Sequence, residues 1–554
     1  MSFDKYLEKI KGDYRQAVKV EWLNYDETVN FEFTNALYDV NASVDVNHQN
    51  GARRSCTLVL NNDNNKFPID YNNIWIGQKF KLWMGVYLDD ETPYYLPQGV
   101  FYVSNPSDTY NPSTRTVTIN GVDKWAWIDG KLNGVLSGTY QTNVDTNLYE
   151  ATRKILSMPN RPLRNDIINS NNIYDYFDVK GISFDPEEED PYFVWSNDGF
   201  RSKNLNPKSR AEATLTAKQD MNLVFDYSYY SDSSIARNSL QLDVNGITVV
   251  DVSVNKQRIS EDALYVGEIK AGEKLHVKAV QGNALGSPGF SISNIKISTS
   301  APIDPQPPFL SSHYMDKLTT ITYLDEETGE KTEKKQSVLL CPYTATVERG
   351  KTIADVLTEY ATILCANIYY DVHGRLTIEP MIKTADDITD TNKEIVWDYS
   401  TEDRTFLGIN QTYNFDKVYN DFIVLGNVLN GYQFKGRVQN RNPLSNTCVQ
   451  KIGLKTKPPI EDNQYVSDEQ CIKLAKYHAK TDTIIQKGAT ISSTPLYHLD
   501  VNKIVSVSTP NNGMSKELFL VTGFSLSSGA TMSVNVTSIN VLKGFQVVEA
   551  TANG

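Results

Sequence analysis

Few residues in this sequence combine the types and the spacing that enzyme chemistry needs. Its six histidines lie far apart, at His48, His276, His313, His373, His478 and His498. No HExxH, GxSxG, phosphate-binding-loop or GxGxxG motif occurs. Cys471 and His478 are seven residues apart on an expected helix, and this spacing favours a packed core face over a metal site. The sequence therefore predicts no catalytic residue, no metal ligand and no cofactor.

One acidic run has the residue types for glycoside hydrolysis but not the placement. Glu187, Glu188, Glu189 and Asp190 stand together between two prolines. Glycosidase carboxyl groups must face each other across a cleft at a fixed separation. A continuous charged run in a proline-bounded segment does not provide that geometry. The run is therefore interpreted as part of a solvated linker.

Three aromatic residues are candidates for binding a sugar, because aromatic faces stack on the apolar faces of sugar rings. They are Trp195, Tyr229 and Tyr230. In an extended strand Tyr229 shares a face with Phe225 and Tyr227, whereas Tyr230 points to the other face. Tyr230 and Trp195 are therefore the better surface candidates. Packing in a core or against a neighbouring subunit is the alternative interpretation for all three.

The composition is that of a folded, acidic chain. It has 554 residues with a net charge of −13, and length alone suggests three or four domains. The acidic balance argues against a protein that mainly grips nucleic acid, since that affinity comes from Lys and Arg. An excess of Tyr over Phe, 32 to 20, favours strands and turns.

The sequence also bears on where the chain is made. No apolar stretch is long enough to span a bilayer. The N-terminus has no apolar run behind a basic segment, so we expect no secretory signal. The five cysteines are widely separated, which indicates free thiols in a reducing cytosol.

Apolar periodicity and capping residues predict four helices. A 3.6-residue period indicates an amphipathic helix over about 1–18 and another over about 145–158, with Asp145 as its cap. Thr352 is expected to cap a third helix. Ser467 is expected to cap a fourth, in a Ser-x-x-Gln capping box.

Alternation with a period of two predicts strands over about 17–129 and 405–545, with the turn spacing of small β-barrels. The two regions share an order of strands and turns although residue identity is low. The matching segments are 76–82, 99–103 and 116–119 in the first region and 499–507, 518–521 and 531–536 in the second. This match suggests an internal repeat.

A separate all-β module lies between two proline-rich segments, 185–191 and 301–308. Its strands alternate, and Asn245-Gly246 is a strong signal for a hairpin turn. We expect a β-sandwich of about eight strands. By our count the module carries 12 basic and 11 acidic residues over 192–300, so the negative charge belongs to the rest of the chain.

Three short motifs, taken in order, resemble those of a known family. They are Thr-Val-Thr-Ile-x-Gly-x-Asp-Lys-Trp at 116–125, Tyr-Asp-x-x-Gly-Arg-Leu at 370–376, and Thr-Pro-Leu-Tyr-His-Leu-Asp at 494–500. In this order, with the preceding Gly-x-Phe-x-Val strand, they are similar to the tail hub proteins of tailed bacteriophages, also called baseplate hub, tail-tip or tail-associated proteins. The resemblance covers about 1–180 and 310–545. The module between resembles a jelly-roll, carbohydrate-binding sandwich.

The resemblance implies a structural role without catalysis. Such hubs are homotrimers in which two barrels per subunit form a pseudo-six-fold ring. The ring joins the hexameric tail tube and distal tail proteins to a trimeric spike or fibre at the tip. DNA passes through the lumen without specific binding, and the tip takes part in host attachment. The resemblance thus implies a virion protein of the tail tip or baseplate, made in the host cytoplasm.

The fold class expected is mainly β with an α/β part: two related small β-barrels forming a hub core, and an inserted jelly-roll-like β-sandwich. The expected divisions are 1–135 for the N-terminal helix and first barrel, 136–190 for the first part of an α/β middle domain, 191–300 for the inserted sandwich, 301–400 for the second part of the middle domain and 401–554 for the second barrel. Two alternatives stay open. One is a glycan-binding surface adhesin, and the other is a tailspike-type glycan hydrolase.

Overall fold

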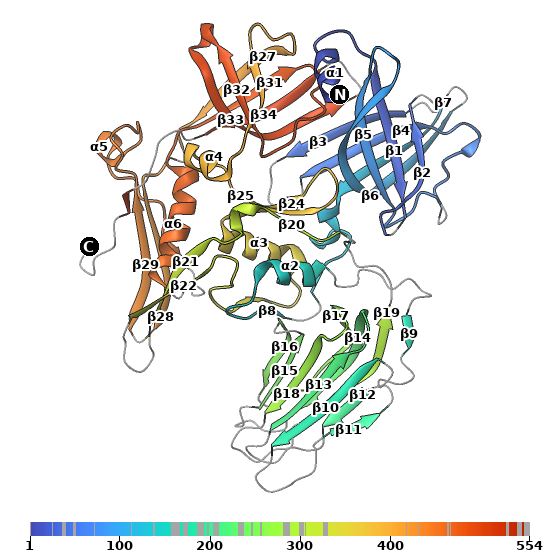
Figure 1. The fold of residues 1–554 in the computed structure, drawn as a ribbon, viewed down its shortest axis with the longest axis vertical. Helices are drawn as coiled ribbons and strands as arrows, with labels where there is room; N and C mark the ends of the chain where they lie inside the picture. Colours follow the sequence, from blue (N-terminus) through green and yellow to red (C-terminus); the bar gives the residue numbers. More distant parts are fainter. Residues whose placement is uncertain are drawn as a thin grey trace. The chain divides into compact units, whose positions relative to one another are not determined.

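The structure is a computed structural model of the chain (Figure 1). It describes residues 2–24, 26–35, 40–47, 51, 53–70, 73–111, 114–136, 139–156, 167–169, 176–184, 193–196, 199–202, 210–230, 238–244, 247–254, 258–280, 289–298, 304, 306–324, 331–416, 418–429, 431–461, 465, 467–527, 531–539 and 546–547. The chain forms two compact units. The first comprises residues 1–126, 309–338 and 361–554, and the second comprises 127–308 and 339–360.

A 13-stranded sheet dominates the first unit, and its N-terminal half is a group of antiparallel strands. These strands are β1 (Gln16–Leu23), β2 (Val29–Thr34), β3 (Val40–Asn47), β4 (Arg54–Asn61), β5 (Lys79–Tyr87), β6 (Pro93–Asn111) and β7 (Thr114–Asp123). Their order in the sheet is β2-β1-β5-β6-β7-β4-β3. The alternating segments of the sequence therefore form strands as predicted.

The C-terminal half of the same sheet is built from strands late in the chain. They are β26 (Ile395–Ser400), β27 (Phe406–Asn414), β31 (Gln486–Ser493), β32 (Ile504–Thr509), β33 (Met514–Ser527) and β34 (Met532–Ser538). Neighbours in the sheet follow the order β27-β31-β34-β33-β32-β26. All of these pairs are antiparallel except β26 with β32, which is parallel.

The two halves repeat one topology. In the first half four consecutive strands lie in the order β4-β7-β6-β5, and in the second half β31-β34-β33-β32 follow the same order. A fifth strand pairs antiparallel with the first of each four, β3 with β4 and β27 with β31. The repeat expected from strand spacing is therefore present in the strand order. The sequence did not predict that β3 pairs with β33 and so joins the halves into one sheet.

One apolar core runs through both halves of this sheet. Strands β4 and β34 bury every second residue, as a sheet with one covered face requires. The cluster includes Leu58 from the first half and Val534 from the second. Stacked rings of Trp22 and Phe80, with centroids 5.7 Å apart, add to the packing in the first half.

Smaller elements complete the first unit. Its other strands are β20 (Phe309–Leu310), β21 (Leu318–Leu324), β22 (Lys331–Ser337), β24 (Ala366–Tyr370), β25 (Leu376–Pro380), β28 (Asp421–Leu429), β29 (Tyr432–Gln439), β30 (Ile460–Glu461) and β35 (Gln546–Val547). Its helices are α1 (Ser2–Lys9), α4 (Ala385–Thr391), α5 (Val449–Ile452) and α6 (Asp468–Asp482). Helix α3 (Ile353–Leu364) begins in the second unit and ends in the first.

The second unit contains two sheets that form the layers of a sandwich (Figure 1). The first has the order β10-β13-β18-β15-β16-β8-β23 and the second has β11-β12-β19-β14-β17 with β9 beside β19. Their bounds are β8 (Tyr140–Thr142), β9 (Ile167–Asn169), β10 (Phe177–Phe184), β11 (Phe193–Ser196), β12 (Gly199–Ser202), β13 (Arg210–Ala217), β14 (Met221–Tyr230), β15 (Asn238–Val244), β16 (Ile247–Val254), β17 (Arg258–Ile269), β18 (Lys274–Val280), β19 (Gly289–Ser298) and β23 (Ala345–Val347). Strands β15 and β16 pair as the predicted hairpin.

The predicted helices exist, with corrections to their ends. The N-terminal helix is α1 alone and is much shorter than 1–18, because β1 already begins at Gln16. Helix α2 (Leu148–Leu156) is capped by Asn147 rather than Asp145, since the Asn147 side chain accepts hydrogen bonds from Tyr149 N and Glu150 N.

The caps predicted for the other two helices are confirmed. Thr352 Oγ1 accepts a hydrogen bond from Asp355 N, and Ser467 Oγ accepts one from Gln470 N. The five cysteines are free thiols, and four of them are buried. Within the part of the chain that the structure describes, no helix is both long and apolar enough to cross a membrane.

Candidate functional site

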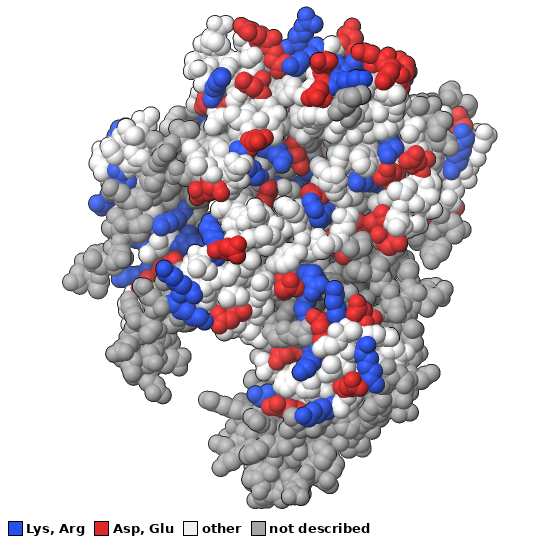
Figure 2. Space-filling model, in the orientation of Figure 1, with Lys and Arg blue, Asp and Glu red and all other residues white. Residues whose placement is uncertain are grey.

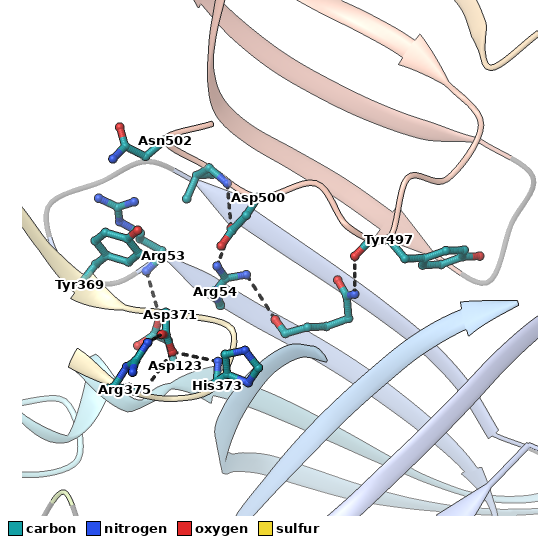
Figure 3. Close-up of polar contacts among 12 residues, drawn as sticks. Arg53, Arg54, Asp123, Tyr369, Asp371, His373, Arg375, Tyr497, Asp500 and Asn502 are labelled. Carbon is teal, nitrogen blue, oxygen red and sulfur yellow. Dashed lines mark hydrogen bonds and ion pairs between the residues drawn. The ribbon is translucent and has the colours of Figure 1, made fainter. Parts of the chain in front are cut away.

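Three segments that are far apart in the sequence meet in one buried cluster of the first unit (Figure 3). They are the end of β7, the β24–β25 hairpin and the 494–502 segment. We call the cluster the polar junction. Its charged members are Glu27, Arg53, Arg54, Lys79, Asp123, Lys124, Glu379, Lys393 and Asp500. The three segments carry the motifs on which the resemblance to tail hubs rests, so the structure brings those motifs together.

An ion pair connects the two halves of the sheet at this junction. Arg54, the first residue of β4, donates from Nη2 to Asp500 Oδ1 at 2.5 Å. Its Nη1 donates to Gln98 O at 3.2 Å, and Gln98 Nε2 donates to Tyr497 O at 2.9 Å (Figure 3). Burial lowers the pKa of Arg54, but Asp500 more than offsets this and raises it. The guanidinium therefore stays charged in an interior position.

A second network places one carboxylate between two buried ammonium groups. Glu27 Oε1 accepts from Lys79 Nζ at 2.8 Å and from Lys124 Nζ at 2.7 Å. Lys124 Nζ also donates to Gly374 O at 2.7 Å, which joins the end of β7 to the hairpin. Burial raises the pKa of Glu27, but the two lysines more than compensate and hold it below its ordinary value.

A third network centres on Glu379 at the end of β25. Its Oε1 accepts from Tyr369 Oη at 2.5 Å and from Asn502 Nδ2, and its Oε2 accepts from Lys393 Nζ at 2.7 Å. Burial raises the pKa of Glu379, but Lys393 and the hydrogen bonds more than compensate, so the net shift is downward. Residues from the hairpin, from the segment before β26 and from the segment before β32 are thus held by one carboxylate.

Arg53 and Asp123 link these networks. The Arg53 guanidinium lies over the Tyr369 ring at 3.5 Å, a cation–π contact. Asp123 accepts backbone hydrogen bonds from Arg53 N at 3.3 Å and Trp125 N at 2.7 Å. Burial raises the pKa of Asp123 to about 6.

The hairpin turn is shaped to fit against the first half of the sheet. Asp371 Oδ1 accepts hydrogen bonds from His373 N at 2.9 Å and Arg375 N at 3.0 Å. Gly374 has a φ of +74°, and a Cβ there would lie 2.6 Å from the Val100 side chain. Glycine is therefore required twice, by the backbone conformation and by the close approach. His373 is part of this turn.

Helix α1 packs against the same 494–502 segment. Tyr6 Oη and His498 Nδ1 are hydrogen-bonded at 3.0 Å, and the rings of Phe3 and Trp397 also contact the imidazole. His498 Nε2 is buried without a hydrogen-bond partner among the described residues. Burial lowers the pKa of His498 to about 4, so the ring is neutral at pH 7.

The chemistry of the junction is that of a structural connection. Its carboxylates are each paired with a cation or with backbone amides. Among the described residues no group of three His, Cys, Asp or Glu side chains is placed to hold a metal ion. Some buried polar atoms of these residues, among them Arg53 Nε and Nη1 and Arg54 Nε, have no hydrogen-bond partner within the described residues. The buried ion pairs still favour one arrangement of the segments they join, because a shifted arrangement would leave charges unpaired. The junction therefore fixes how the two halves and the hairpin fit together.

The residues singled out from sequence alone lie elsewhere. The backbone of Trp195 lies in β11 and that of Tyr229 and Tyr230 in β14, within one six-stranded sheet. Their side chains lie outside the described part of the structure, as does the whole acidic run 187–190. Cys471 is buried, and His478 Nδ1 lies 3.4 Å from Lys457 Nζ.

Most charged members of the junction were not predicted. Only Asp123, Lys124 and Asp500 lay in segments quoted for the resemblance. A signal was present for Arg54, which occupies an inward position in the alternating strand Arg54–Asn61. A charged residue at an inward position is costly unless it is paired, so it points to a partner from elsewhere in the chain.

Comparisons with known proteins give likenesses in structure only. No family model matches the chain, and no curated protein matches it. Among solved structures it is similar to the 43 kDa tail protein of prophage MuSo2 from Shewanella oneidensis, with 10% identity, a TM-score of 0.43, and coverage of 94% of this chain and 98% of that one. It is similar to a tail protein from Neisseria meningitidis MC58, with 9% identity, a TM-score of 0.44, and coverage of 95% and 97%. A carbohydrate-binding module CBM36, solved with calcium and xylotriose, matches 24% of this chain and 98% of its own length, with 11% identity and a TM-score of 0.13.

Proposed function

We propose that the chain is a structural hub at the tail tip or baseplate of a tailed phage or phage-like particle. It forms a homotrimer that joins a hexameric tail tube and distal tail proteins to a trimeric spike or fibre. The observation that carries the proposal is the shared strand order, β4-β7-β6-β5 and β31-β34-β33-β32. Two similar halves in each of three copies present six similar surfaces, which is what a trimer needs to meet a six-fold tube.

The polar junction supports a role in which the two halves of the sheet keep a fixed arrangement. The halves are joined by the β3–β33 pairing and by the Arg54–Asp500 ion pair. A connector that passes a signal from tip to tube must keep its halves in one arrangement. Buried networks with several charges serve that need better than an apolar contact that tolerates sliding.

The proposed role requires no catalysis. DNA passes through the lumen of the ring without specific binding. The net charge of −13 fits this passage, because Lys and Arg contacts to phosphate would hold the DNA back. The protein acts in the virion and is made in the host cytoplasm.

We further propose that the sandwich of the second unit either contacts host glycans or braces neighbouring tail proteins. Trp195, Tyr229 and Tyr230 are the proposed sugar-stacking residues. A glycan array with the full-length chain separates the two roles, with Trp195→Ala and Tyr230→Ala as the test variants. Binding that both variants abolish supports glycan contact, whereas an empty array favours bracing.

The hub proposal is tested by native mass and imaging. Light scattering of the full-length chain at several concentrations should give the mass of a trimer, or a fraction of trimer that rises with protein concentration. Electron microscopy of that species should show rings with three-fold symmetry and six similar lobes. A monomer at every concentration that also forms no ring on a hexameric tail tube would overturn the proposal.

A further inference from the structure

The surface loop between β29 and β30 is held in a fixed conformation by hydrogen bonds from buried side chains. This segment, the 441–459 loop, contains α5 and connects two strands that flank β28 in one sheet. The side chain of buried Asn420 is hydrogen-bonded to the loop backbone at three points. Its Nδ2 donates to Thr447 O at 3.1 Å and to Gly453 O at 2.8 Å, and its Oδ1 accepts from Lys455 N at 2.8 Å.

A second buried residue fixes the start of the loop. Asn440 Nδ2 donates to Ser445 Oγ at 2.9 Å, and Asn440 O accepts from Val449 N at 3.0 Å. Asn420, Asn440 and Ser445 are all fully or nearly fully buried. An ordinary surface connection is satisfied by water and needs no such support. The chain therefore holds this loop in one conformation.

The loop presents large apolar side chains to solvent. Leu444 is 77% exposed, Leu454 is 54% exposed and Ile452 is 41% exposed. Single exposed apolar residues are ordinary, whereas three on one loop of fixed conformation favour a role in binding. A rigid display of this kind lowers the entropy lost when a partner binds.

The stretch of sequence that carries these side chains is basic although the whole chain is acidic. Residues 422–460 contain six basic residues and no Asp or Glu: Lys435, Arg437, Arg441, Lys451, Lys455 and Lys457. Two of them pair outside this stretch, Arg437 with Asp421 and Lys457 with Asp482. Figure 2 shows Lys and Arg side chains over α5, α6 and β29.

The cations of the loop itself are available to a partner. Among the described residues, Arg441 Nε donates to Gln439 Oε1 alone and Lys451 Nζ to Asn446 Oδ1 alone. Lys455 has no side-chain bond, and none of the three has an ion pair within the described residues. Within the described residues these three positive charges have no acidic partner, and they stand on the same loop as the exposed aliphatic side chains.

We propose that the 441–459 loop is a docking surface for an acidic segment of a partner protein that also carries aliphatic side chains. Leu444, Ile452 and Leu454 would cover the partner's apolar groups, while Arg441, Lys451 and Lys455 pair with its carboxylates. A copy of the same loop is excluded as the occupant, since like charges would meet. Nucleic acid fits less well, because aliphatic side chains offer no aromatic stacking to bases.

The proposal does not depend on the hub function. The test uses a fluorescein-labelled 18-residue helical peptide of Glu, Ala and Leu, with Leu at positions i, i+3, i+4 and i+7. Its anisotropy is measured with the full-length chain. We expect binding that weakens with added salt, because exposed charge pairs are screened.

Two loop variants test the two parts of the surface. Lys451→Glu with Lys455→Glu, and Leu444→Ser with Leu454→Ser, should each weaken binding about tenfold or more. The matched control is Leu407→Ser with Lys516→Glu, which changes an exposed leucine and an exposed lysine elsewhere in the first unit and should alter binding less than twofold. Thermal unfolding should be unchanged in all three, since the substituted side chains are exposed.

Several results would overturn the proposal. They are no binding of the Glu peptide, equal binding of a peptide with Lys in place of Glu, and loop variants that bind as well as the control. Preferential binding of a 20-base-pair DNA duplex would reassign the surface to nucleic acid. Loss of self-association in the loop variants would reassign it to a second copy of the chain. A hub that fails to trimerise would leave these binding results unaffected, so the two proposals fail separately.

Discussion

Arg54 and Asp500 form a buried ion pair across 446 positions of sequence, with 2.5 Å between Nη2 and Oδ1. The pair connects the first strand of one repeated four-strand group to the segment that precedes the second strand of the other. Arg54 is paired with Val46 of β3, and Val46 is paired with Phe524 of β33, so the ion pair lies next to the β3–β33 pairing that joins the two halves. Charge and backbone pairing therefore secure the same connection.

Breaking this pair should destabilise the first unit strongly. Asp500→Asn leaves the buried Arg54 guanidinium without its counter-charge, so we expect a loss of about 3 kcal/mol or more in the free energy of unfolding. Chemical denaturation followed by tryptophan fluorescence measures it. The double variant Arg54→Met with Asp500→Leu should lose less than the sum of the single changes, because the Arg54 charge is removed together with its partner.

The matched control is an exposed pair in the same unit. Arg15 and Glu91 form a 2.7 Å ion pair with both side chains mostly in solvent. Glu91→Gln should cost less than about 1 kcal/mol. Equal effects of Asp500→Asn and Glu91→Gln would show that the junction pair contributes no more than a surface pair.

The carboxylate between two lysines gives a second test. Glu27→Gln removes the charge that both Lys79 Nζ and Lys124 Nζ contact, and leaves two buried ammonium groups near each other. We expect a loss of about 3 kcal/mol or more. Lys79→Met in the Glu27→Gln background should restore part of the loss by removing one of the two like charges. A double variant less stable than Glu27→Gln alone would contradict this account.

The comparison of sequence and structure separates local signals from long-range ones. The caps at Thr352 and Ser467 were predicted because a cap needs only residues within one helical turn. The cap predicted at Asp145 was wrong by two positions, because Asn147, whose side-chain oxygen can also accept backbone hydrogen bonds, lies directly before the helix. Helix α1 was predicted too long: it ends at Lys9, and a short connection leads to β1 at Gln16.

The junction shows what the sequence cannot specify by local pattern. The order of motifs predicted a hub-like chain, yet nothing in their spacing paired Arg54 with Asp500 or Glu379 with Lys393. Such pairs depend on tertiary folding, and one sequence carries no record of which distant residues meet. The strand repeat was easier to detect, because turn spacing records the length of each strand.

His498 predicts a pH dependence that one substitution isolates. Its pKa falls from 6.5 to about 4 because the ring is buried. The unfolded chain therefore binds a proton below pH 6.5 that the folded chain accepts only near pH 4. The free energy of unfolding due to His498 is fully present above pH 6.5 and falls by about 3 kcal/mol as the pH drops to 4.

Asp123 acts in the opposite direction in the same window. Its pKa is raised to about 6, so its contribution improves as the pH falls toward 4 and the two effects partly cancel in the native chain. The measurement is therefore the difference in unfolding free energy between the native chain and His498→Asn at each pH. That difference should shift by about 3 kcal/mol in favour of the variant between pH 6.5 and 4. A difference that is independent of pH would show that His498 titrates normally in the fold.

Two glycines with the same backbone conformation test how closely the hairpin approaches the first half of the sheet. Gly374 has a φ of +74° and Gly513 has a φ of +72°, so alanine is strained to a similar degree at both. At Gly513 a Cβ would meet no atom within 4 Å, whereas at Gly374 it would lie 2.6 Å from Val100.

Gly513→Ala should lower the free energy of unfolding by about 1 kcal/mol, from backbone strain alone. Gly374→Ala should cost at least about 2 kcal/mol, since the hairpin must also move away from Val100 and stretch the Lys124 Nζ bond to Gly374 O. Denaturation of the two variants side by side measures the difference, and Gly374→Ala with Val100→Ala should recover the part that comes from the clash. Equal costs for the two glycines would mean that the hairpin does not press against β6.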